Sequence, residues 1–161
     1  MGRCRSCSQG ADLLPTLIRH RPGAPGLRLG LGPGLRPVDA MGQLQHLFNS
    51  HSFWARGRQR DDLQRMLRGS QVAVSAWSGR ELIGFGRATS DGVYRALLWD
   101  VVVHSGHQGQ GLGRMLVQRL LASPELSGVE RIYLMTTNSA GFYQRLGFEP
   151  VTQQLLLHKQ S

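Results

Sequence analysis

The sequence is poor in cysteine, in lysine and in long apolar runs. Its 161 residues include only two cysteines, Cys4 and Cys7, which excludes a disulfide framework and a zinc site built from cysteines alone. The six histidines have no close spacing that would suggest a metal site, so we expect none. No segment approaches the roughly 18 consecutive apolar residues of a membrane-spanning helix. Hydrophobic residues still make up 40% of the chain, enough for the core of one domain.

Positive charge is concentrated near the N-terminus. The formal net charge is +9, and lysine contributes only Lys159, so nearly all cations are arginines. Residues 1–36 hold six arginines against one acid, whereas 37–161 hold 13 basic and nine acidic residues. This distribution argues against nucleic-acid binding by the main body of the protein. It leaves such binding to the first segment alone, as a hypothesis that predicts steep salt dependence.

Residues 1–34 are expected to form a flexible head, because they contain seven glycines and four prolines, which break helices and strands. The head lacks the long apolar run of a secretory signal. Its composition leaves three alternatives open: a transit peptide, an arm that contacts a partner, or a dispensable or artefactual extension. The Cys4–Cys7 pair lies in this head, outside any strand–helix context. A single domain over 35–158 follows.

The pattern of apolar residues in 35–158 predicts an α/β domain. Helices are expected from a cap at Asp39 onward and over 61–67, 111–122 and 138–146. Strands are expected over 71–77, 81–89, 93–103 and 131–136, with a final strand or hairpin over 148–158 that Pro150 interrupts.

A glycine-rich loop is the most informative segment. Gly109, Gly111 and Gly113 follow a buried strand and open a helix, so that backbone N–H groups and the helix dipole together form an anion site. Glycines let the backbone approach a pyrophosphate closely, and Arg114 adds positive charge. A dinucleotide fold would need its glycines directly after the strand. A Walker loop would need Gly-Lys-Ser or Gly-Lys-Thr, which is absent here.

Two motifs resemble those of the GNAT N-acetyltransferases. The segment Gln-Gly-Gln-Gly-Leu-Gly over 108–113 resembles the family's Q/R-x-x-G-x-G/A signature, and 138–148 resembles its later motif of Asn, Phe-Tyr and Leu-Gly-Phe. Segments 87–96 and 99–103 are similar to a cyanobacterial and plastid branch, whose members are described as serotonin N-acetyltransferases. Plastid members are also described as acetylating protein lysines and N-termini. The resemblance implies a cytoplasmic protein, or one of the plastid stroma if the head is a transit peptide.

The resemblance implies a GNAT fold, in which helices cover both faces of a mixed central sheet and two parallel strands splay apart around acetyl-CoA, the co-substrate. The residues implied to bind acetyl-CoA are Val101, Val102, Val103, Gln108, Gly109, Gln110, Gly111, Leu112, Gly113, Arg114, Asn138 and Tyr143. Tyr143 would also be catalytic, protonating the CoA thiolate as it leaves. A backbone N–H near Val102 or Val103 would polarise the thioester carbonyl. No metal is implied.

The general base is not identified by the resemblance, because the positions that often carry it are apolar here. Asp100, His104 and a chain of water molecules remain alternatives. Asp100 can serve only if a bulge changes the phase of its strand, and otherwise it would be a strand-end residue that satisfies loop N–H groups.

The implied reaction is direct acetyl transfer from acetyl-CoA to a primary amine. The enzyme is expected to be a monomer or a homodimer. The favoured acceptor is an arylalkylamine such as serotonin, which Phe53 and Trp54 would stack against. A protein lysine or N-terminus is the alternative acceptor. A non-catalytic acyl-CoA sensor is the alternative of another class.

Overall fold

A single mixed sheet forms the centre of the protein in the computed structural model, which describes residues 14–21 and 28–161. Its order is β1-β2-β3-β4-β5. The strands are β1 (Thr16–His20), β2 (Val72–Ser78), β3 (Glu81–Ser90), β4 (Arg95–Val103) and β5 (Arg131–Leu134). Neighbours are antiparallel except β4 and β5, which are parallel. The α/β domain predicted from the sequence and the mixed sheet implied by the resemblance are confirmed.

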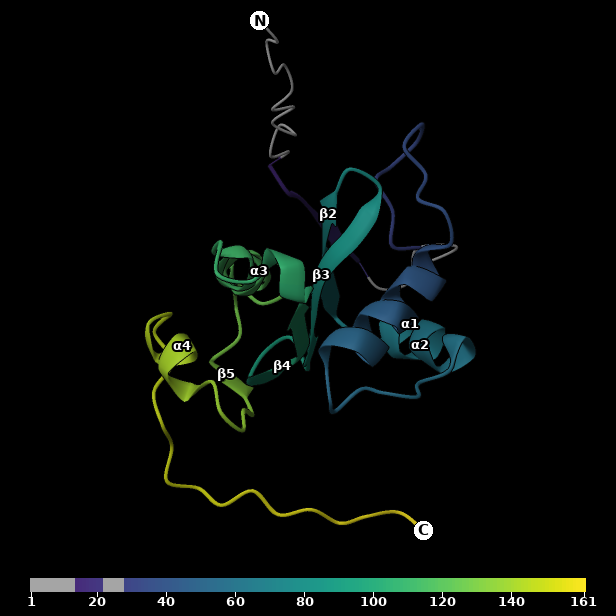
Figure 1. Ribbon diagram of the computed structural model, residues 1–161. Helices are drawn as coiled ribbons and strands as arrows, with labels where there is room; N and C mark the ends of the chain where they lie inside the picture. The colour runs from purple at the N-terminus through teal and green to yellow at the C-terminus, as the bar shows by residue number, and fades with distance from the viewer. Residues whose placement is uncertain (1–13, 22–27) are drawn as a thin grey trace, which may run out of the picture.

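Helices cover both faces of this sheet (Figure 1). On one face lie α1 (Ala40–His51) and α2 (Arg60–Arg68), and on the other lie α3 (Leu112–Leu121) and the short α4 (Ala140–Gln144). Each face has its own apolar core. Phe48 of α1 packs edge-on against Phe85 of β3 with ring centroids 5.6 Å apart, whereas Leu116 of α3 belongs to the core of the opposite face. This two-sided burial explains why successive residues of β2 and of the first half of β3 are buried, rather than alternate ones.

The start of α1 follows the sequence prediction. The Asp39 side chain accepts a hydrogen bond of 3.1 Å from the Gly42 backbone N–H, which satisfies one of the unpaired donors at the helix start. The second helix, expected over 61–67, begins one residue earlier at Arg60 and has no side-chain cap.

Part of the expected flexible head is ordered. Residues 16–20 form β1, which pairs with β2 from Thr16 opposite Trp77 to His20 opposite Ala73. Arg19 of this strand forms an ion pair with Glu125, beyond α3, and Leu29 is only 1% exposed. The expectation of a flexible head therefore does not hold for these residues, because partners far along the chain hold them. Cys4 and Cys7 lie outside the described residues.

The predicted final strand over 148–158 is wrong. Residues 149–161 form no helix or strand and are exposed, and Figure 1 shows this tail extending away from α4. Pro150 lacks the N–H that a strand ladder needs. Leu155, Leu156 and Leu157 are consecutive, so a strand would place leucines on both of its faces, and their exposures range from 75% to 87%.

His20 makes the stability of the fold dependent on pH. Its Nε2 lies 2.7 Å from the Ser75 hydroxyl, and burial lowers the pKa of His20 to about 4. The unfolded chain takes up this proton below about pH 6.5 while the folded protein does not, so stability is present above pH 6.5 and is lost as the pH falls toward 4. The loss attributable to His20 amounts to about 3 kcal/mol of unfolding free energy.

We expect His20→Gln to remove most of that loss. Urea unfolding at pH 7 and pH 4.5 is the measurement, with His158→Gln, in the exposed tail, as the control. The wild type and the control should lose about 2–3 kcal/mol more than His20→Gln between the two pH values. Equal losses in all three proteins would refute this role of His20.

Candidate active site

The two parallel strands, β4 and β5, pair only along the first part of β4. Pairing between β4 and β5 runs from Arg95 opposite Arg131 to Leu98 opposite Leu134. There β5 ends, while β4 continues to Val103. Beyond Leu98, no strand within 14–21 and 28–161 pairs with β4 on the side of β5, so this part of β4 forms an open edge. The expected separation of the parallel strands corresponds to the end of their pairing at Leu98 and Leu134, which leaves a gap beside β4.

A bulge in β4 lies at the mouth of this gap. Phe85 pairs with Val102 and Arg87 pairs with Trp99, so that Asp100 and Val101 together stand opposite Gly86. The Asp100 backbone is left-handed, with φ of 55°. Leu98 and Val102 consequently face opposite cores, although simple alternation would place them on the same face. The change of strand phase that the sequence left open does occur.

The glycine-rich loop joins β4 to α3 beside the gap. Gly109 and Gly111 have φ of 78° and 81°, a conformation that side chains other than glycine rarely adopt. Gly111 is the N-cap of α3 and provides no capping side chain. The first N–H groups of the helix are therefore left for a bound anion.

A first cavity of about 970 Å³ lies between this loop, β4 and α4. Its lining includes most of the residues implied to bind acetyl-CoA: Val101, Val103, Gln108, Gly109, Gly111, Leu112, Gly113, Arg114 and Tyr143. Val102 does not line it, because its side chain is 3% exposed in the core under α1. Gln110 is exposed outside the lining, and Asn138 lines a second cavity instead.

The first cavity also contains residues that sequence analysis missed. They are His107, Gln118, Ser139, Phe142, Arg145, Leu146 and Gly147. Arg145 adds a second cation to the lining that contains Arg114, and its place within the Phe-Tyr…Leu-Gly-Phe motif was the available signal. Gly113 allows α3 and α4 to approach closely, since a Cβ there would lie 3.4 Å from Cζ of Phe142.

The second cavity, of about 460 Å³, meets the first at three shared residues: Val101, Ser139 and Tyr143. Phe53 and Trp54 line it, with ring centroids 5.1 Å apart and exposures of 62% and 47%. Trp99 lines it as well, and its indole N–H donates a 2.7 Å hydrogen bond to Oγ1 of Thr89. Aromatic side chains predicted from the sequence thus share one cavity with Tyr143.

Tyr143 lies in α4 at the junction of the two cavities. Its ring packs edge-on against Phe142 and Phe148, with centroids 4.9 and 5.9 Å away. Burial raises the pKa of Tyr143 above its usual value, so its hydroxyl is protonated at neutral pH. The position and the protonation state suit a proton donor.

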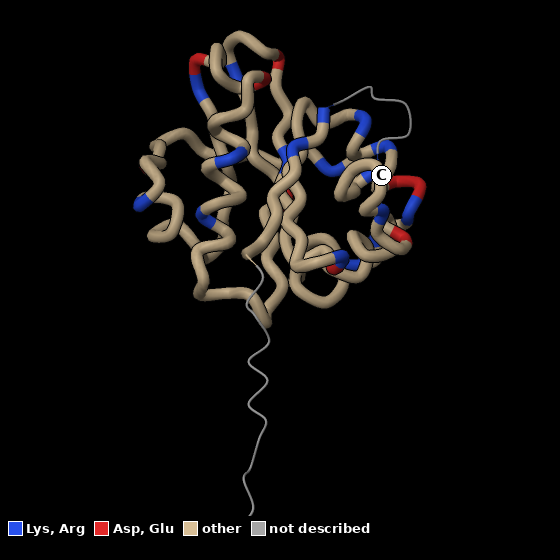
Figure 2. The backbone as a smooth tube through the Cα atoms, turned by 90° about the horizontal axis from the view of Figure 1, so that it is seen from above, with Lys and Arg blue, Asp and Glu red and all other residues tan. Residues whose placement is uncertain are grey.

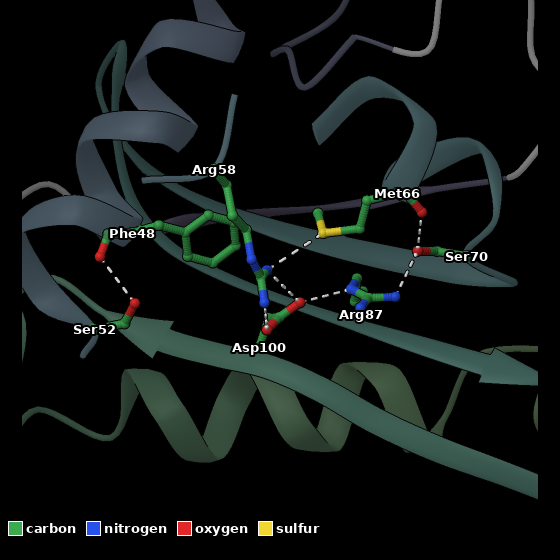
Figure 3. A network of polar contacts seen from close by, with 7 residues as sticks. All are labelled: Phe48, Ser52, Arg58, Met66, Ser70, Arg87 and Asp100. Carbon is green, nitrogen blue, oxygen red and sulfur yellow. Dashed lines mark hydrogen bonds and ion pairs between the residues drawn. The ribbon is translucent and has the colours of Figure 1, made fainter. Parts of the chain in front are cut away.

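Asp100 is enclosed by two arginines (Figure 3). Its side chain is 3% exposed, and Oδ2 lies 2.7 Å from Nε of Arg87 and 3.0 Å from Arg58. Burial alone would raise the pKa of Asp100, but hydrogen bonds from Arg58 and Arg87 and their charges outweigh it and hold the pKa below its usual value. A carboxylate so engaged accepts protons poorly, so this arrangement does not support Asp100 as the general base.

His104 of the neighbouring loop does not replace it. Nδ1 of His104 accepts the Gly106 N–H, and its ring lies 4.1 Å from that of His51, outside the lining of both cavities. Burial and the neighbouring His104 and His46 lower the pKa of His51. Of the alternatives from the sequence, a chain of water molecules stays a prediction.

Charge and composition set further limits on the described part of the chain. Figure 2 shows Lys and Arg positions scattered over the body and interspersed with acids, not gathered in one stripe. Within 14–21 and 28–161, no group of three or more His, Cys, Asp or Glu side chains is arranged to hold a metal ion. The helices described there are all too short or too polar to cross a membrane.

Comparisons with known proteins give a consistent picture. The model of the acetyltransferase (GNAT) family matches residues 41–148. The chain is 42% identical to serotonin N-acetyltransferase 2, chloroplastic, of Oryza sativa subsp. japonica over 97 residues, which are 56% of this chain and 48% of that protein. It is 42% identical to histone acetyltransferase TAP1 of Glycine max over 71 residues, 44% of this chain and 31% of that protein.

The solved structures agree on the fold. A GNAT-family acetyltransferase from Streptococcus pneumoniae superposes with a TM-score of 0.66 at 19% identity, covering 91% of this chain and all of that one. The matched part of this chain spans about half of the rice relative's length and about a third of the soybean relative's length.

Proposed function

This chain belongs to the GNAT family of acetyltransferases, and from that premise we propose that it transfers the acetyl group of acetyl-CoA directly to a primary amine, preferentially an arylalkylamine. The observation that carries the proposal is the junction of the two cavities. One is lined by a glycine-rich loop at a helix N-terminus and the other by aromatic side chains, and Tyr143 lies in both linings. A thioester held in the first cavity would present its carbonyl carbon to an amine in the second.

Binding of acetyl-CoA would use backbone groups more than side chains. The N–H groups at the start of α3 and the cations of Arg114 and Arg145 suit the pyrophosphate. The unpaired edge of β4 beyond Leu98 offers N–H and C=O groups to the amide-containing arm, with the side chains of Val101 and Val103 facing the same cavity. This division of roles accounts for the buried Val102 side chain, since only its backbone would take part.

The chemical step needs few protein groups. The neutral amine attacks the thioester carbonyl carbon, the new C–N bond forms, the C–S bond breaks, and sulfur leaves with the bonding electrons as a thiolate. Tyr143 donates its proton to that sulfur, and a chain of water molecules takes the proton released by the amine. A backbone N–H near Val102 or Val103 stabilises the oxyanion.

The arylalkylamine preference is supported by Phe53, Trp54 and Trp99 around the second cavity and by the similarity to the rice serotonin N-acetyltransferase. Protein amines are the second candidate, and the similarity to the soybean histone acetyltransferase favours them. One observation favours a sensor without turnover. Asp100, the carboxylate that lines the second cavity, forms ion pairs with two arginines and so is a poor general base.

Removing the aromatic rings of the second cavity tests the acceptor class. We expect Trp54→Ala and Phe53→Ala to raise KM for tryptamine about 3–10-fold, because each loses a stacking contact with the indole. KM for spermidine and affinity for acetyl-CoA should not change. Steady-state CoA release over an amine series is the measurement.

Tyr94→Ala is the matched control for these variants, because Tyr94 is also exposed, at 61%, but lies in the turn before β4 and lines neither cavity. Turnover of a lysine peptide or a free N-terminus, with none of tryptamine or serotonin, would move the assignment to protein amines.

A further inference from the structure

The loop that carries Phe53 and Trp54 is held firmly to one side of the molecule. It spans 52–59, between α1 and α2. The Gly57 N–H donates to Oδ1 of Asn49 at 2.9 Å, and the Gln45 side-chain amide donates to the Arg58 carbonyl at 3.0 Å. These bonds tie the loop backbone to α1. They do not connect the loop to β4, which also contributes residues to the second cavity.

Arg58 makes that connection. One terminal nitrogen lies 3.1 Å from Oδ1 of Asp100 and the other lies 3.0 Å from Oδ2, so the ion pair is bidentate (Figure 3). The guanidinium carbon lies 5.2 Å from the centre of the Phe48 ring, and one nitrogen is 3.5 Å from Sδ of Met66. The guanidinium is thus confined on several sides, although the side chain as a whole is 32% exposed.

The other end of this contact is the bulge itself. Asp100 has the left-handed backbone of the bulge and lies between Trp99 and Val101, all three of which line the second cavity. Arg87 holds the same carboxylate from β3, donates 3.3 Å to Oγ of Ser70 and lies 5.7 Å from the centre of the Trp99 ring. The bulge, the indole of Trp99 and the loop with Phe53 and Trp54 therefore meet at one carboxylate.

We propose that Arg58 is a positioning residue for acceptor binding: its two-armed ion pair with Asp100 holds the 52–59 loop against the β4 bulge, so that Phe53 and Trp54 face Trp99 across the second cavity. The inference rests on the proposed function for its substrate, an arylalkylamine. A planar guanidinium is required because only its fork matches both carboxylate oxygens, which a lysine ammonium cannot do.

The expected signature is a change in KM without a change in kcat. Arg58→Met should raise both KM and the dissociation constant for tryptamine about tenfold, since a displaced loop no longer presents its rings to the acceptor. At saturating tryptamine the rate should stay near that of the wild type, because Tyr143 and the first cavity are untouched. Arg58→Lys should lose most of the same affinity, since the charge remains but the fork is gone. Folding should survive, because Asp100 keeps its bond to Arg87.

The experiment combines CoA-release kinetics of the full chain, calorimetric binding of tryptamine to CoA-saturated protein, and hydrogen exchange of the 52–59 peptide. Arg60→Met is the matched control, because Arg60 pairs with Asp39 at an exposed site at the start of α2 and lines neither cavity. The proposal is supported if tryptamine affinity falls and exchange of 52–59 rises in Arg58→Met but not in Arg60→Met.

Unchanged tryptamine affinity in Arg58→Met overturns the proposal, whatever the exchange of the loop. An equal loss in Arg60→Met also overturns it. Binding of tryptamine that depends on Arg58, in a wild-type protein without turnover, supports the positioning role and rejects the proposed function instead.

Discussion

Tyr143→Phe is expected to lower turnover about 10²–10⁴-fold while leaving affinity for acetyl-CoA nearly unchanged. The substitution removes one hydroxyl and keeps the ring that packs against Phe142 and Phe148. Because burial raises the pKa of Tyr143, the wild-type hydroxyl carries its proton at neutral pH and can protonate the CoA thiolate. Without it, the thiolate must leave unprotonated or take a proton from water, which raises the barrier of the chemical step only.

The measurement is CoA release at saturating amine, together with acetyl-CoA binding by calorimetry. Tyr133→Phe is the matched control, since Tyr133 lies on β5 and lines neither cavity. Full turnover in Tyr143→Phe would reject the general-acid role. A parallel loss of acetyl-CoA binding would instead make Tyr143 a binding residue.

Gly111→Val is expected to fail at an earlier step, by weakening acetyl-CoA binding about 100-fold. Gly111 has φ of 81°, which a β-branched residue adopts only with strain, and it forms the N-cap at the start of α3. No protein atom lies within 4 Å of a Cβ placed there, so the core is not disturbed. We expect the substitution instead to change the direction of the N–H groups at the start of α3 and to fill space that the pyrophosphate needs.

The control for this variant is Gly128→Val, because Gly128 is also open to added atoms but has no left-handed backbone and lies outside both cavities. Acetyl-CoA affinity from calorimetry and the melting temperature separate a binding defect from unfolding. Normal affinity in Gly111→Val would remove the assignment of this loop to the pyrophosphate.

Much of the fold could be predicted from local patterns. The cap at Asp39 and the strands β2 to β4 follow from residue types next to each other in the chain. β1 could not be predicted, because Leu17 and Ile18 are too short an apolar run, and only pairing with β2 orders them. The strand predicted over 148–158 was wrong for the opposite reason. Its leucines suggested a strand, but no described strand pairs with this segment.

In the candidate site, too, local features could be predicted from the sequence and contacts between distant residues could not. The glycine-rich loop is contiguous, so its chemistry is visible in the sequence. The surroundings of Asp100 are not, since Arg58 and Arg87 lie 42 and 13 residues away and meet it only through the bulge. The second cavity likewise gathers residues from the loop after α1, from β4 and from the segment after β5. Phe53 and Trp54 could be predicted from the sequence, but the ion pairs of Asp100 with two arginines could not.

The most direct test of the central claim is the release of CoA by the full chain with acetyl-CoA and an amine, counted against N-acetylated product by mass spectrometry. The amine series holds serotonin, tryptamine, spermidine, a lysine peptide and a peptide with a free N-terminus. Direct transfer predicts one N-acetylamine for each CoA, with release that depends on the amine and is fastest for the arylalkylamines. Acetyl-CoA binding without release above the amine-free rate, for every member of the series, would contradict the account.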